Sequence, residues 1–148
     1  MKKKLILSVI IAILFGFISA KFLYHNYEVK IKEPIYNSYL LQTGVYSDKD
    51  SLKKGLKNLN DYIVREENGK YYVYVGITTS KSNADKIKKA YDDKNIDIYI
   101  KQDNINNVEF ISNLEQYDVL LESVDKKKDI LSINEVILST YEEMVVKK

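Results

Sequence analysis

The chain has 148 residues, with 23 Lys and Arg against 21 Asp and Glu, thirteen tyrosines, one histidine and no cysteine. Three of the basic residues lie in the first four positions, so 20 basic residues face 21 acidic ones elsewhere, and this balance excludes long-range attraction to nucleic acid. The absence of cysteine excludes disulfides and thiol chemistry, and a single histidine, His25, excludes a histidine-based triad or a multi-histidine metal site.

Met1 is followed by three lysines at residues 2–4 and by an apolar stretch at residues 5–20. A helix of that length spans about 24 Å, less than the roughly 30 Å hydrocarbon core of a bilayer. Two interpretations are open: a signal peptide cleaved near Ala20, or a retained single-pass anchor that extends to Tyr24. We favour the anchor, residues 1–24. In both cases the lysines stay inside, and the rest of the chain is exported from the cytoplasm.

Residues 25–37 are polar and contain the single proline, Pro34, so we expect a short juxtamembrane linker. Fully extended, it reaches about 45 Å. It would therefore keep the following domain near the membrane.

The next segment alternates strand and helix signals. Residues 38–46 predict a strand, and 47–50 (Ser-Asp-Lys-Asp) form a capping box that opens a helix. Residues 62–66 and 70–77 predict two strands. They are joined through Asn68-Gly69, a strong hairpin signal.

A second capping box at 82–85 predicts a helix with Ala84, Ile87 and Tyr91 inward, and 96–101 predict a closing strand in which isoleucines alternate with polar or aromatic residues. The order is βαββαβ, and Gly44-Val45 has a weak counterpart 32 residues later in Gly76-Ile77. We therefore expect an α+β fold, with a ferredoxin-like antiparallel sheet and helices on one face.

Three segments carry a family resemblance: 41–47 (LQTGVYS), 71–76 (YYVYVG) and 96–101 (IDIYIK). They resemble the SPOR (sporulation-related repeat) domain, whose members have a V-Q-x-G-x-F/Y-S first strand and a W/Y-R-V-x-V-G third strand. The resemblance covers about residues 38–102. It implies a non-enzymatic module that binds peptidoglycan, favours glycan strands stripped of stem peptides, and acts in cell division or sporulation.

The resemblance also implies a ligand surface, and it has three departures. Tyr72 stands where the family has Arg, Ile77 where Pro is common, and Thr43 where an apolar residue is usual. The implied glycan-binding residues are Gln42, Gly44, Ser47, Tyr72, Tyr74 and Gly76.

Strand geometry predicts the same surface independently. If Val73 and Val75 are buried, Tyr72 and Tyr74 point to the open face of the sheet, and glycines beside them let a polymer approach closely. The alternative is that these tyrosines fill cross-strand pairs or are covered by the C-terminal region.

That C-terminal region, 103–148, predicts two amphipathic helices at about 105–124 and 132–146. Packing on their own domain, packing across the open sheet, dimerisation and partner binding all remain open. A protein-interaction scaffold, in which these helices recruit a division or spore-envelope partner, is therefore the alternative function.

Catalytic and cofactor signals are weak throughout. Asp48 and Asp50 resemble the start of an EF-hand loop, but Lys53 and Leu59 replace its glycine and glutamate. There is no Gly-rich phosphate loop. We predict no catalytic residue, no metal and no cofactor.

Overall fold

A computed structural model describes residues 36–147. The predicted anchor and nearly all of the predicted linker lie outside these residues, so both remain predictions. Within the described part of the chain, no helix combines the length and apolar character needed to span a bilayer.

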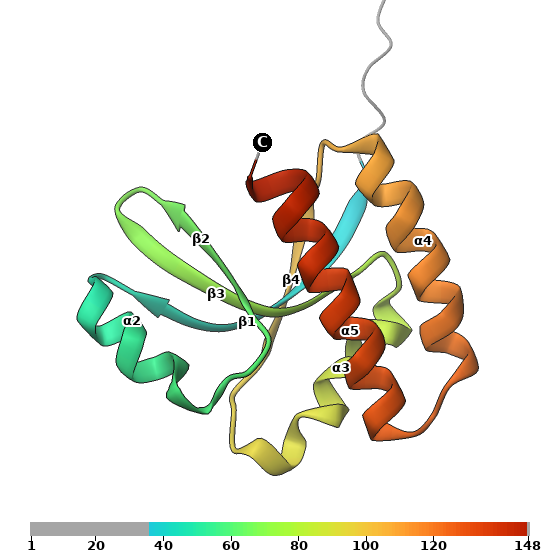
Figure 1. The fold of residues 1–148 in the computed structure, drawn as a ribbon, viewed down its shortest axis with the longest axis horizontal. Helices are drawn as coiled ribbons and strands as arrows, with labels where there is room; N and C mark the ends of the chain where they lie inside the picture. Colours follow the sequence, from blue (N-terminus) through green and yellow to red (C-terminus); the bar gives the residue numbers. More distant parts are fainter. Residues whose placement is uncertain (1–35, 148) are drawn as a thin grey trace, which may run out of the picture. The chain divides into compact units, whose positions relative to one another are not determined.

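The fold is α+β, as predicted, and its centre is a four-stranded antiparallel sheet (Figure 1). The strands lie in the order β2-β3-β1-β4. Their bounds are β1 Asn37–Tyr46, β2 Ile63–Glu67, β3 Lys70–Thr78 and β4 Tyr99–Asn104. The first three match the predicted strands, but β4 begins three residues later than expected.

The β2–β3 hairpin confirms the Asn-Gly signal. Asn68 and Gly69 have φ values of 52° and 72°, the left-handed conformation that a type I′ hairpin turn requires at both central positions. The turn sets the register in which Glu67 pairs with Lys70 and Ile63 with Tyr74.

Four α-helices occur in the described residues: α2 Lys49–Gly55, α3 Lys81–Ala90, α4 Val108–Ser123 and α5 Lys127–Tyr141. Short 3₁₀ turns, η1 Leu56–Asn58 and η2 Asp92–Lys94, follow α2 and α3, and a π-helical turn, η3 Glu142–Val146, follows α5.

The predicted helix starts need correction. The N-cap of α2 is Asp48 rather than Ser47, because its carboxylate accepts hydrogen bonds from the backbone N–H groups of Asp50 and Ser51 at 3.0 and 2.8 Å. The cap of α3 is Ser80, two residues before the predicted box. Helix α5 begins five residues before the predicted start, with Lys127 and Lys128 in its first turn.

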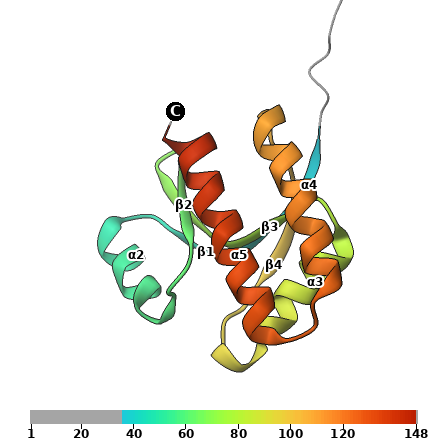
Figure 2. The same cartoon turned by 45° about the vertical axis from the view of Figure 1, so that its right-hand side comes forward.

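The C-terminal helices pack on their own domain. Helix α5 contacts β3 and α3, and α4 contacts α5 and α3. Figures 1 and 2 show α3, α4 and α5 grouped together while α2 lies apart at the other end of β1. Consistent with this separation, α2 buries none of its residues. The described residues, 36–147, belong to one compact unit, and the predicted domain boundary at 102 falls inside β4.

Two interactions fix α5 in place. The Asn134 side-chain amide donates a hydrogen bond of 2.7 Å to the Val75 carbonyl in β3. The rings of Phe110 and Tyr141 meet edge-to-face with centroids 5.2 Å apart. The buried core therefore draws on both the sheet and the C-terminal region, including Leu40, Leu41, Val75, Ile77, Ile87, Phe110, Leu114, Leu121 and Ile137.

The sheet is strongly curled. The two edge strands β2 and β4 would be about 14 Å apart in a flat four-stranded sheet. Yet Arg65 of β2 binds Asp103 of β4 directly, with 2.8 Å between Nη1 and Oδ2. The curl brings side chains together that are distant in the pairing scheme.

Candidate functional site

The predicted glycan-binding residues lie along β1 and β3, and Ser47 follows the end of β1. Gln42 pairs with Tyr74 of β3 and, on its other side, with Tyr99 of β4. The structure leaves Ser47 exposed and Gln42, Gly44 and Tyr72 half-buried, but it buries Tyr74 and Gly76.

The expectation that Tyr74 faces an open surface is wrong. Its side chain is 0% exposed, and the Arg65 guanidinium lies 5.7 Å from the ring centroid. Burial raises the pKa of Tyr74 to about 12, against a smaller opposing effect of Arg65. Val73 and Val75 are buried as well, so both faces of β3 are covered at this point and neither is open. A fully buried ring has no face on which to stack a sugar.

The two glycines of the predicted surface are also filled by the protein itself. A Cβ on Gly44 would lie 2.8 Å from the Tyr46 ring. On Gly76 it would lie 3.1 Å from atoms of both Ile87 and Asn134. The space beside each glycine is therefore occupied by side chains of the protein itself and is not open to an approaching polymer.

A different exposed surface remains on the sheet, which we call the β4 patch and define as Gln42, Tyr72, Tyr99 and Lys101. Tyr99 is 68% exposed and pairs with Gln42, and Lys101 follows two residues later on the same face of β4. The Lys101 ammonium lies 5.8 Å from the centroid of the Tyr72 ring. The patch therefore combines an exposed aromatic ring, an amide and a cation.

A compact ion cluster lies beside the patch. Arg65 binds Glu67 at 2.6 Å and Asp103 at 2.8 Å. Burial acts to lower the pKa of Arg65, but the hydrogen bond to Asp103 and the surrounding negative charge raise it, so the group stays a cation. Its charge is neutralised by its two partners. Lys101 has no salt-bridge partner among residues 36–147.

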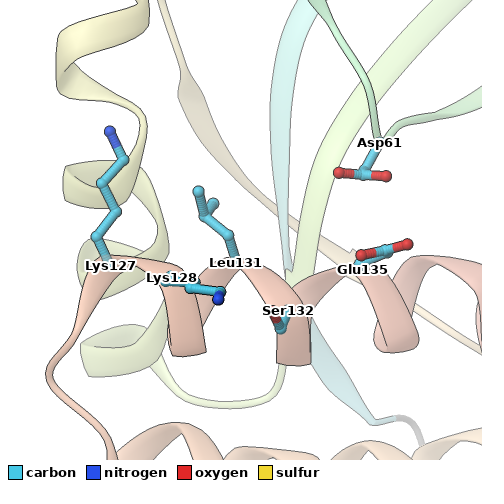
Figure 3. A pocket seen from close by; sticks show the side chains of 6 residues that line it. All are labelled: Asp61, Lys127, Lys128, Leu131, Ser132 and Glu135. Atoms are coloured by element: carbon cyan, nitrogen blue, oxygen red, sulfur yellow. The ribbon is translucent and has the colours of Figure 1, made fainter.

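A pocket lies on α5, away from the β4 patch (Figure 3). It has a volume of about 460 Å³, and five residues of the first turns of α5 line one side while Asp61 lies opposite. The lining has two acidic side chains, two basic ones and two uncharged ones: Asp61, Glu135, Lys127, Lys128, Leu131 and Ser132. Lys127 also binds Asp93. The pocket therefore offers no nucleophile with an adjacent base. Its charged side chains are of both signs, so it has no strong net charge with which to attract a ligand.

Among the described residues, no cluster of three or more acidic or histidine side chains is placed to hold a metal ion.

No family model matches the chain, and neither does any curated protein or solved structure.

The sequence interpretation missed Tyr99 and Lys101 as surface residues. The available signal was the alternation in 96–101, which sets isoleucines against polar or aromatic neighbours and so predicts an exposed row on β4. It also missed Asp118, a buried carboxylate on the apolar stripe of α4 between Leu114 and Leu121.

Asp118 links α4 to the turn that connects β3 and α3. Its carboxylate accepts hydrogen bonds from the Thr79 N–H at 2.8 Å, the Thr79 hydroxyl at 2.7 Å and the Asn83 amide at 3.0 Å, and it also accepts one from the Thr78 hydroxyl. Four donors satisfy the carboxylate, so it stabilises the fold rather than serving as a reactive group.

Proposed function

We propose that this is a membrane-anchored, extracytoplasmic, non-enzymatic protein that binds peptidoglycan glycan strands through a SPOR-like domain, in cell division or sporulation. The domain would have the ferredoxin-like arrangement. The sheet order β2-β3-β1-β4, with all neighbours antiparallel, and the βαββαβ order of the elements support it.

The observation that carries the glycan proposal is the β4 patch. Carbohydrate binding needs a flat apolar ring for the sugar face and polar groups for the hydroxyl and acetamido groups. The patch supplies the exposed ring of Tyr99 beside the amide of Gln42, on the rigid backbone of two paired strands. We therefore move the proposed contact surface from Tyr74 and the glycines to these residues and keep Tyr72.

The anchor would serve the same function. A linker with a reach of about 45 Å restricts the domain to the wall nearest the membrane. Confinement raises the effective concentration of a weak binding site facing a long polymer. Cleavage near Ala20 would release the domain instead.

Co-sedimentation tests the proposal. The full-length chain in detergent micelles is mixed with purified cell wall, either untreated or treated with an amidase that removes stem peptides. We expect retention on the treated wall and weaker retention on the untreated wall. Absence of the chain from both pellets contradicts the proposal.

The scaffold remains the second candidate, because α4 and α5 expose apolar side chains while being firmly fixed to the domain. Val119, Leu120 and Val136 are 65%, 50% and 48% exposed. Cross-linking in cells, comparing the wild type with Leu120→Asp, tests it. A protein adduct lost in the variant supports recruitment, whereas identical adducts in both argue against it.

A further inference from the structure

We propose that Lys101 recognises a carboxylate on the bound glycan, namely the lactyl carboxylate exposed on muramic acid when its stem peptide is removed. This inference rests on the glycan-binding function proposed above and names the chemistry by which the β4 patch would select its ligand.

The position of the ammonium is the first argument. Lys101 is on β4 and Tyr72 on β3, with β1 between them, yet Lys101 Nζ lies 5.8 Å from the Tyr72 ring centroid. The lysine therefore folds back over the sheet. The contact with the half-buried Tyr72 ring favours one placement of the ammonium without neutralising its charge.

The lack of a protein counter-ion is the second argument. The neighbouring cation on this part of the sheet, Arg65, is bound to Glu67 and Asp103. Asp103 would otherwise be the natural partner of Lys101, because it lies two residues further along the same face of β4. Since Arg65 occupies that carboxylate, the Lys101 charge is left available to a ligand.

The position of the Lys101 ammonium is also of interest because of Tyr72, which departs from the family pattern. Tyr72 stands where the resemblance leads one to expect arginine, a loss of positive charge on β3. The curl of the sheet brings the positive charge of Lys101, from another strand, against the Tyr72 ring.

The three groups of the patch then define a ligand. A pyranose ring fits the exposed Tyr99, its polar substituents fit Gln42, and a carboxylate on the sugar fits Lys101. In intact peptidoglycan the lactyl carboxyl is an amide and carries no charge, whereas stem-peptide removal restores the carboxylate. Lys101 would thus discriminate between the two states of one polymer by charge.

The test compares two ligands and three proteins by binding affinity. The ligands are isolated glycan strands freed of stem peptides, and the same strands with their carboxylates converted to methylamides. The proteins are the full-length wild type, Lys101→Gln, and Lys57→Gln as a control. Lys57 is an exposed lysine in η1. Thermal unfolding of each variant confirms that the fold is kept.

We expect the wild type and Lys57→Gln to bind the amidated strands about fivefold more weakly than the native ones, the size of an exposed ion pair of about 1 kcal/mol. Lys101→Gln should bind both ligands equally, at the weaker level. If Lys101→Gln still distinguishes them, or if the wild type does not, Lys101 does not read the carboxylate, although glycan binding itself stands. If the wild type binds neither ligand, the proposed function is wrong and this inference fails with it.

Discussion

Replacing Asp118 by alanine tests whether the C-terminal helices are integral to the domain. Four hydrogen-bond donors, from Thr78, Thr79 and Asn83, converge on this carboxylate, which is 5% exposed. A net hydrogen bond to a charged group contributes about 1.5–3 kcal/mol, but four donors on one carboxylate are not additive, and some donors regain water. We expect Asp118→Ala to lower the free energy of unfolding by about 3–4 kcal/mol.

The measurement is urea unfolding followed by circular dichroism. A loss of 3 kcal/mol corresponds to a fall of roughly 12 °C in the thermal midpoint for a domain of about this size. Asp85→Ala is the matched control, because Asp85 is exposed on α3 and pairs only with Lys81 at the surface, at 3.3 Å. It should change stability by less than about 0.5 kcal/mol. If Asp118→Ala is within 1 kcal/mol of the control, the coupling of α4 to the β3–α3 turn is not significant.

Three further predictions follow from the packing. Truncation after Asn104 removes Phe110, Leu114, Leu121 and Ile137 from the core, so it should abolish the cooperative unfolding transition; a truncated chain that keeps that transition would show that the sheet folds alone. Gly76→Ala places a Cβ 3.1 Å from Ile87 and Asn134 and should cost about 1–3 kcal/mol by urea unfolding, whereas an unchanged midpoint would mean that α5 shifts freely. Burial raises the pKa of Tyr74 and Tyr91 to about 12, above the ordinary value near 10. The folded state therefore holds these protons more tightly than the unfolded state. Stability should be constant up to about pH 10 and fall toward pH 12, by about 1.4 kcal/mol per pH unit for each tyrosine; a urea midpoint that stays flat to pH 12 would contradict their burial.

Local signals in the sequence identified much of the fold correctly. The Asn68-Gly69 pair predicts a turn that depends on two backbone conformations and little else, and the hairpin is present. Ala84, Ile87 and Tyr91 are buried as the helical periodicity of α3 predicted. These features depend on neighbours within a few residues.

The errors arise where distant parts of the chain decide the outcome. Strand β4 begins at Tyr99 rather than at Ile96, after the chain has left η2 through Asn95 with φ of 52°. Tyr74 is buried together with Val73 and Val75, so side chains from other parts of the chain cover both faces of β3 there.

The residues that make up the β4 patch could not be predicted from the sequence, because they are brought together by the curl of the sheet. The proximity of Lys101 to Tyr72, and of Arg65 to Asp103, joins strands that are not neighbours in the pairing order. Alternation on β4 predicts which residues face the same side. It does not predict which side chains from other strands meet them.

Glycan affinity of the full-length chain with and without the Tyr99 ring tests the central proposal most directly. Tyr99→Ala should weaken binding to strands freed of stem peptides about tenfold, equivalent to roughly 1.4 kcal/mol of lost stacking. Leu120→Ala, an exposed apolar truncation on α4, should leave the affinity unchanged. Binding by Tyr99→Ala that equals the wild type would contradict the β4 patch as the glycan surface.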